Sequence, residues 1–359
     1  MYCVALVRGS GSRYPRLVRN PEPVLGSIIL GVCYVLRMIG DLGDGTLTWI
    51  SPIGWGQEMQ PWGANRWSPL GLMLLLACAL LALSTRIEAA RDYGAGLLPE
   101  RSGKPAAPQR YASALGLGLR LQRGPIIGWT ITVALTALLF GSVVQAMTNL
   151  LNDAGGSVPL LLRGTGVKAL QSLLTLMIAM ITTVFAVQST LTLRSDEASG
   201  ILEPQLAGSL SRTRWATQRH LIPAVGSALL LLLGGGLMGA GYGAIVGDPD
   251  QTRILAWAAL SYWPAVMVFV ALTVALFSWL PRLTITLSWG VLVAMWLLVL
   301  AGDALHLPTW LLDVLPFSAT PYQPLEPPSW TPLMLMTLAA AALIWVGLAR
   351  FRSRDIAPG

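Results

Sequence analysis

The chain has 359 residues, of which 54% are hydrophobic and only 11% are charged, and its formal net charge is +7. Soluble domains carry about 25% charged residues, so this composition excludes an ordinary soluble domain. Three scattered cysteines (Cys3, Cys33 and Cys78) and two distant histidines (His220 and His306) form no disulfide framework or metal-binding motif, and we expect no cofactor. The arginines are spread among many loops, which speaks against a nucleic-acid-binding patch and in favour of membrane topology.

Apolar runs long enough to cross a bilayer recur along the chain. A transmembrane helix needs about 20 predominantly apolar residues. Eight runs come near this length: 24–40, 69–85, 126–148, 169–193, 221–246, 254–280, 284–301 and 331–349. Residues 1–20 lack the apolar core of a signal peptide. The sequence therefore predicts an all-α membrane protein with about eight transmembrane helices.

Basic residues are distributed unequally between the two sets of loops that these spans define. One side carries 19 of them: Arg8, Arg13, Arg16, Arg19, Arg86, Arg91, Arg101, Lys104, Arg110, Arg120, Arg123, Arg194, Arg212, Arg214, Arg219, Arg282, Arg350, Arg352 and Arg354. The other side carries 4: Arg66, Arg163, Lys168 and Arg253. Because cytoplasmic loops are enriched in Lys and Arg, we expect a multi-pass protein of the cell membrane with both termini in the cytoplasm.

Two of the expected outer loops share an order of residues. Residues 40–70 and 302–333 both open with Gly-Asp, continue through a Trp and a Pro (Trp49 and Pro52, Trp310 and Pro316), and close with Trp-x-Pro-Leu before another span. Duplicated halves are common in transporters. The second copy ends a unit of six spans, whereas the first copy has only its last two, so the sequence predicts one whole unit preceded by the tail of another.

A polar segment, RSDEASGILEPQLAGSLSRTRW at 194–215, interrupts two of the most apolar stretches of the chain. It carries both charge signs, and Ile201, Leu202, Leu206 and Leu210 recur at near-helical spacing. These features favour a short cytoplasmic helix that docks a partner protein. The alternative interpretation is a solvated interfacial loop.

The chain resembles the ABC-2 type exporter permeases, and among them the duplicated polyketide-antibiotic and multidrug exporter permeases. Three stretches carry the resemblance: 194–215, LTWISPIGWGQEMQPWGANRW at 47–67, and ARDYGAGLLPERSG at 90–103. Members of this family have two six-span units, from which this sequence departs by lacking four spans at its start. The resemblance implies the ABC-2 type exporter fold and a docking site for an ATPase, the coupling helix, at Asp196, Glu197, Gly200, Glu203, Leu206, Arg212 and Arg214.

The predicted organisation follows from the spans and the resemblance. It comprises a cytoplasmic N-terminal segment (1–23), a partial first unit (24–85), a cytoplasmic linker with an elbow helix (86–124), a complete six-span unit (125–350) and a cytoplasmic tail (351–359). We expect the chain alone to form a homodimer through the complete unit or to be degraded.

The predicted function is that of a membrane permease subunit that exports small hydrophobic or amphiphilic compounds, such as a drug or a polyketide antibiotic, by alternating access. The chain contains no Gly-x-x-x-x-Gly-Lys-Ser/Thr string, and no catalytic set of residues, so ATP hydrolysis is expected on a separate ABC ATPase subunit. The alternative is a truncated, non-transporting membrane remnant or an assembly subunit.

Two groups of residues inside the spans complete the prediction. Gln145, Gln171 and Gln188 are polar groups that face the bundle interior, where they line a substrate path or form helix–helix hydrogen bonds. Gly235, Gly239, Gly243 and Gly247 recur at four-residue spacing, which lets two helices approach closely in lipid. A hinge at these glycines is the alternative.

Overall fold

The computed structural model describes residues 46–60, 63–89, 113–153, 166–200, 202, 211–302, 308 and 314–354, together with scattered residues between 26 and 40. Every regular element in these ranges is a helix. The chain divides into two compact units, Met1–Lys104 and Pro105–Gly359, which are described separately. The predicted all-α class is therefore confirmed.

Within the described residues 46–60 and 63–89, the first unit forms two short helices and one long one. They are the 3-10 helix η1 (Thr46–Ile50), α2 (Pro52–Glu58) and α3 (Ser68–Ala89). The indole Nε1 of Trp55 donates a hydrogen bond of 2.7 Å to the carbonyl oxygen of Trp49, which ties α2 to η1. Gly54 permits this close turn, because a Cβ there would lie 2.2 Å from the carbonyl oxygen of Thr48.

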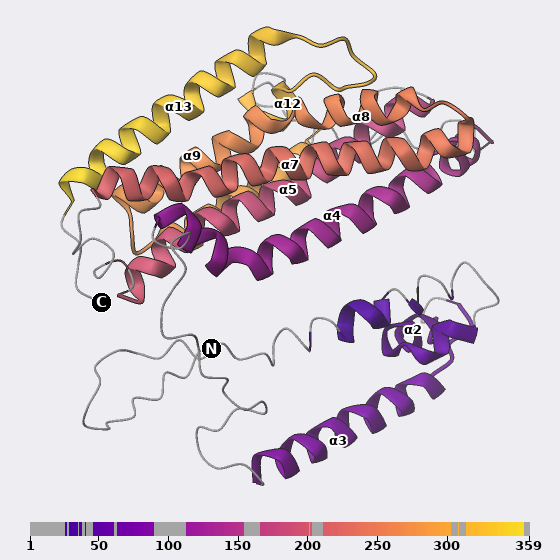
Figure 1. Ribbon diagram of the computed structural model, residues 1–359. Helices are drawn as coiled ribbons and strands as arrows, with labels where there is room; N and C mark the ends of the chain where they lie inside the picture. The colour runs from indigo at the N-terminus through magenta and orange to yellow at the C-terminus, as the bar shows by residue number, and fades with distance from the viewer. Residues whose placement is uncertain are drawn as a thin grey trace. The chain divides into compact units, whose positions relative to one another are not determined.

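The second unit is a bundle of long helices (Figure 1). Its elements are α4 (Ala114–Asp153), α5 (Val167–Ala198), α7 (Arg212–Val246), α8 (Asp250–Leu260), α9 (Trp263–Trp279), α10 (Thr284–Ala301), α12 (Pro316–Ala319) and α13 (Trp330–Ser353). Helix α7 contacts α4, α5 and α8, while α9 contacts α5 and α13. Helices α5, α7 and α9 therefore form the interior of the bundle.

Seven of the eight predicted spans coincide with helices. Among the described residues, six segments are long and apolar enough to cross a membrane: Ser68–Arg86, Ala114–Met147, Val167–Ala198, Arg212–Val246, Asp250–Trp279 and Trp330–Ser353. The predicted span 284–301 forms α10, an apolar helix of somewhat shorter length. The predicted span 24–40 is described only in part and stays a prediction.

Several helices are longer than the apolar runs that predict them. The 32 residues of α5 correspond to about 48 Å at about 1.5 Å per residue, whereas the hydrocarbon core of a bilayer is about 30 Å thick. The last turns of α5, with its charged residues, therefore project beyond the apolar part of the bundle. Similarly, residues 114–124 of the predicted elbow segment form the first turns of α4, which continues through Pro125 and changes direction near its start (Figure 1), and the elbow stays a prediction.

The predicted span 254–280 is two helices rather than one. Helix α8 ends at Leu260 and α9 begins at Trp263, with Ser261 and Tyr262 between them. Pro264 explains the break, because a proline lacks the N–H group and clashes with the preceding helical turn, so it is tolerated in the first turn of a new helix.

The connection between α10 and α13 packs into the bundle through α12. Phe317 is 1% exposed and stacks on Phe269 of α9 at 5.4 Å between ring centroids. The hydroxyl of Ser172 on α5 donates to the carbonyl oxygen of Tyr322 at 3.0 Å and accepts from the N–H of Leu325 at 3.2 Å. These contacts fix the described part of the connection, 314–329, against the end of the bundle where α5 and α13 begin.

The two repeated loops share one local feature. Pro52 is the first residue of α2 and Pro316 is the first residue of α12, and each short helix precedes a long apolar helix, α3 or α13. Proline suits the first turn of a helix because the N–H group it lacks would be unpaired there. The shared prolines thus begin a short helix in the described part of each loop.

Candidate functional site

The polar segment predicted to dock a partner lies between the end of α5 and the start of α7. Helix α5 ends at Ala198, and Gly200 follows with φ of +70°, a left-handed conformation that glycine adopts without strain. Helix α7 begins at Arg212, where the Ser211 hydroxyl caps the helix by accepting from the N–H of Arg214. Both ends of the segment are thereby fixed by local hydrogen bonds.

Asp196, in the last turn of α5, forms an ion pair with Arg219 of α7. The two side chains are 10% and 2% exposed, so the pair is buried. The Arg219 guanidinium also lies over the ring of Trp215 at 6.0 Å. Gly118 of α4 leaves space for it, because a Cβ there would lie 2.4 Å from Nη1 of Arg219. This pair therefore joins the ends of α4, α5 and α7.

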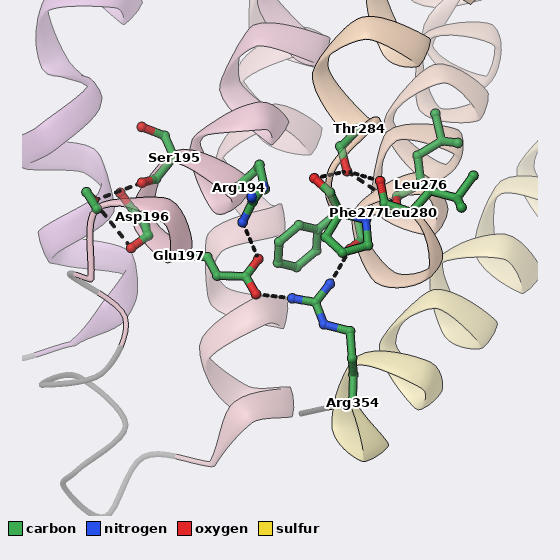
Figure 2. Close-up of polar contacts among 11 residues, drawn as sticks. Arg194, Ser195, Asp196, Glu197, Leu276, Phe277, Leu280, Thr284 and Arg354 are labelled. Carbon is green, nitrogen blue, oxygen red and sulfur yellow. Dashed lines mark hydrogen bonds and ion pairs between the residues drawn. The ribbon is translucent and has the colours of Figure 1, made fainter. Parts of the chain in front are cut away.

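Glu197, the next residue of α5, forms ion pairs with two arginines (Figure 2). Arg354, just beyond α13, donates to Oε1 of Glu197, and Arg194 donates to Oε2 at 3.3 Å. The Glu197 side chain is 3% exposed. Arg354 also donates to the carbonyl oxygen of Phe277 at 2.6 Å, near the end of α9, where helix carbonyls lack intrahelical partners.

Aromatic rings surround the Arg354 guanidinium. It lies 5.1 Å from the ring centroid of Phe277 and 5.7 Å from that of Phe351. Arg212 completes the arrangement by donating to the backbone carbonyl of Arg354 at 2.7 Å. Together these contacts hold the ends of α5, α7, α9 and α13 at one end of the bundle.

We call this set the charged cluster: Arg194, Asp196, Glu197, Arg212, Arg219 and Arg354. It contains four arginines and two carboxylates, so positive charge is in excess. Because an uncompensated buried charge is costly, each carboxylate stabilises the arginines around it. The cluster is an ion-paired junction of helix ends in which both carboxylates are buried.

The structure assigns different environments to the predicted docking residues. Asp196 and Glu197 are buried and have partners within the chain, so they hold the segment in place instead of projecting from it. Arg214 is exposed at the start of α7, while Arg212 is half-buried against Arg354. Glu203 and Leu206 lie outside the described residues, and docking itself stays a prediction.

Sequence reasoning missed Arg219 and Arg354 as members of this site. They lie 23 and 157 residues from their partners Asp196 and Glu197, so no helical spacing could connect them. The one available signal was their position, since both lie at the ends of spans on the basic side.

The three glutamines predicted for a substrate path have separate partners. The Gln145 amide donates to Asn149 at 3.1 Å, and that of Gln171 lies 3.4 Å from the Gln251 oxygen. The Gln188 oxygen accepts from the Trp129 indole at 2.7 Å, beside a cavity of about 260 Å³ that also contacts Pro125 and Thr132 of α4. These bonds are helix–helix or local contacts, and the path stays a prediction.

The glycines at four-residue spacing lie along the contact between α7 and α8. A Cβ at Gly235 would lie 2.2 Å from the carbonyl oxygen of Leu255, and one at Gly239 would lie 2.3 Å from that of Gln251. A Cβ at Gly243 would lie 2.5 Å from the carbonyl oxygen of Asp248. Gly247 differs, because it ends α7 with φ of +73°. We call Gly235, Gly239 and Gly243 the glycine seam.

The described residues define a multi-pass all-α membrane protein with a charged junction at one end, and among them no group of His, Cys, Asp or Glu side chains could hold a metal ion. A family model described as the multidrug efflux system permease Rv1217c, C-terminal domain, matches residues 111–352. The multidrug efflux system permease protein Rv1217c of Mycobacterium tuberculosis (strain ATCC 25618 / H37Rv) is 38% identical over an alignment of 333 residues that covers 91% of this chain.

The chain therefore belongs to this family of multidrug efflux permeases, which confirms the resemblance to ABC-2 type exporter permeases. The alignment spans 61% of the length of the mycobacterial relative. The matched residues 111–352 include α4 to α12 and all but the last residue of α13, and they contain every member of the charged cluster except Arg354.

Proposed function

We propose that the chain is the membrane-spanning permease subunit of an ATP-binding-cassette exporter. It moves hydrophobic or amphiphilic compounds, such as drugs or polyketide antibiotics, outward across the cell membrane by alternating access, while a separate ATPase subunit hydrolyses ATP. The family name supports efflux of multiple compounds.

The charged cluster is the observation that carries this proposal. Segment 199–211 is attached directly to α5 and α7, and the buried ion pairs of Asp196 and Glu197 tie those helices to α4 and α13. A force applied to the segment by an ATPase therefore acts on several transmembrane helices together. A loose loop between two helices would dissipate the same force.

An exporter driven by ATP needs the charged cluster on the cytoplasmic side of the membrane, and the distribution of basic residues supports this orientation. The Arg-rich ends of α5, α7 and α13 lie together through the contacts of the cluster, whereas Lys168 and Arg253 lie near the opposite ends of their helices. By the positive-inside rule, the cluster faces the cytoplasm, where ATP and the ATPase are found.

Arg214 offers the sharpest test of docking. Its side chain is exposed at the end of the segment, so Arg214→Glu reverses a charge without breaking the cluster. We expect this variant, reconstituted with its ATPase in proteoliposomes, to lose most of the stimulation of ATP hydrolysis and most substrate efflux. The double variant Glu203→Lys with Arg212→Glu should have the same or a greater effect.

Arg253→Glu is the matched control, because Arg253 has a 73% exposed side chain at the other end of the bundle. It should insert, purify and transport as the unaltered chain does. Full coupling in Arg214→Glu and in the double variant would contradict the docking proposal.

For the substrate path we propose Gln188 as the first residue to examine, with Gln145 and Gln171 as secondary candidates. Gln188 is exposed on α5 beside Trp129 and next to the small cavity. Gln188→Leu should change the relative efflux of different amphiphiles, while a purely structural hydrogen bond would lower the efflux of all of them equally.

A further inference from the structure

A larger cavity lies at the opposite end of the bundle from the charged cluster. Its volume is about 870 Å³, and it is bounded by α7, α8, α9, α13 and the connection that precedes α13. The lining includes Ala228 of α7, Trp257 of α8, Trp263 of α9 and Trp330 of α13. Figure 1 shows α13 alongside α9, with α12 at the end where α13 begins. The volume is in the range of about 300–1,000 Å³ that is typical of sites for small ligands.

Three polar side chains of the lining, those of Ser261, Trp263 and Thr337, donate hydrogen bonds within the protein. The Ser261 hydroxyl donates to the carbonyl oxygen of Ala258 at 2.7 Å, and the Trp263 indole donates to that of Ala224 at 2.9 Å. The Thr337 hydroxyl donates to the carbonyl oxygen of Leu333 at 2.7 Å. None of the described residues that line the cavity is charged. Its chemistry therefore selects an uncharged, apolar occupant.

The mouth of the cavity is formed by large apolar side chains on the outer surface of the bundle. Trp257 and Trp330 are 62% and 68% exposed, and Met334 and Leu338 are 62% and 66% exposed. Trp330 is the first residue of α13, and Trp is favoured at the membrane–water interface. Leu338 lies eight residues further along the helix, or about 12 Å deeper at about 1.5 Å per residue. The cavity thus extends from the interface into the hydrocarbon region.

Water is a poor occupant of this space. A stable buried water needs two to four polar partners. The lining is mostly apolar, and the Ser261 and Thr337 hydroxyls and the Trp263 indole already donate to backbone carbonyl oxygens. Acyl chains are the most concentrated apolar groups next to an opening of this kind.

We propose that the cavity is a binding site for one acyl chain of a membrane lipid, in the leaflet nearest the start of α13. The bound chain fills the space beside the break between α8 and α9, at Ser261 and Pro264, and supports α13 against these helices. This site is separate from the ATPase-docking function, so its test does not depend on transport.

The test uses nanodiscs that contain a phosphatidylethanolamine with a photoactivatable diazirine on its acyl chain. After irradiation, peptide mapping identifies the labelled residues. For the unaltered chain we expect labelling to concentrate on peptides that contain residues 257–264 and 328–338. Labelling spread evenly over all membrane-facing helices would overturn the proposal.

Two substitutions fill the cavity from opposite walls: Ala228→Trp on α7 and Thr337→Phe on α13. Thr337 is at an exposed position, so its variant keeps the test available even when Ala228→Trp fails to fold. We expect labelling of both peptides to fall several-fold. Leu229→Trp is the matched control, because Leu229 is 60% exposed on the same helix and does not line the cavity. Unchanged labelling in the filled variants, or an equal loss in the control, would contradict a specific site.

Discussion

Helix α7 is held to its neighbours by two different kinds of interaction along its length. Near its start, Arg219 forms an ion pair with the Asp196 carboxylate of α5, within the buried part of the charged cluster. Further along, Gly235 and Gly239 let its backbone approach the carbonyl groups of α8 with no side chain between them. The first arrangement uses long polar side chains near the ends of the helices. The second uses the absence of side chains, which lets two apolar helices pack closely without polar groups, and polar groups are costly inside a bilayer.

The comparison shows how the two ends of the bundle are suited to different tasks. Ion pairs depend on orientation and can transmit a displacement between helices that are not in close backbone contact. A glycine seam fixes two helices as one body. We therefore expect α7 and α8 to move together during transport, while a displacement at the end of the bundle that carries the charged cluster is passed on through its ion pairs.

Removing the Asp196 carboxylate should have the largest effect. In Asp196→Ala the buried Arg219 loses its counter-ion, and breaking a buried pair in this way costs about 3–5 kcal/mol. We expect a marked decrease in the apparent melting temperature in detergent, measured by intrinsic fluorescence. The double variant Asp196→Asn with Arg219→Gln should recover part of the loss, because it leaves no uncompensated charge. A double variant less stable than Asp196→Ala would contradict this account of the pair.

The next largest effect should come from the glycine seam. Gly235→Ala places a methyl group against the Leu255 carbonyl oxygen, and the forced separation of α7 and α8 should cost about 1–3 kcal/mol. Gly236→Ala is the matched control on the neighbouring position, where a Cβ would meet only the Ala256 Cβ at 4.0 Å. The control should be as stable as the unaltered chain or slightly more so, because alanine favours the helix. Similar melting temperatures for the two variants would show that the seam is not tightly packed.

A smaller effect is expected for Arg354→Lys. Lysine keeps the charge opposite Glu197, but it cannot donate to both Glu197 and the Phe277 carbonyl in the planar geometry of a guanidinium or stack as well on Phe277 and Phe351. We expect a loss of about 1 kcal/mol, in the range of a single net hydrogen bond. Arg352→Lys, at an exposed position on α13, is the control and should have no measurable effect. A larger loss of stability for Arg352→Lys than for Arg354→Lys would contradict the assignment of the stabilising contacts to Arg354.

The features that sequence reasoning predicted are those that depend on local patterns. The apolar runs predicted the long helices from residue 68 onwards, because the length and hydropathy of a segment determine whether it can span a bilayer. The four-residue repeat of glycine pointed to the face of α7 that meets α8, although Gly247 instead ends the helix. Pro264 was present in the predicted span 254–280 and is the signal for the break between α8 and α9 that the apolar run concealed.

The features that sequence reasoning missed depend on contacts between distant segments. Asp196 and Glu197 are typical of an exposed, solvated segment by residue type, yet both are buried because Arg219 and Arg354 reach them from α7 and from the end of α13. A single sequence has no spacing rule for such pairs. The same limit applies to Phe317, whose place among the rings of α9 depends on how the connection before α13 folds back.

The orientation of the charged cluster is central to the whole account, because docking of an ATPase requires it to face the cytoplasm. The direct test is cysteine labelling in a background in which Cys3, Cys33 and Cys78 are replaced by serine. Cysteines are introduced one at a time, at Ser209 in the segment between α5 and α7 and at Ser329 just before α13. A membrane-impermeant maleimide added to intact cells should label Ser329→Cys and should label Ser209→Cys only after the membrane is permeabilised. Labelling of Ser209→Cys in intact cells, or of both positions from the same side, would contradict the account.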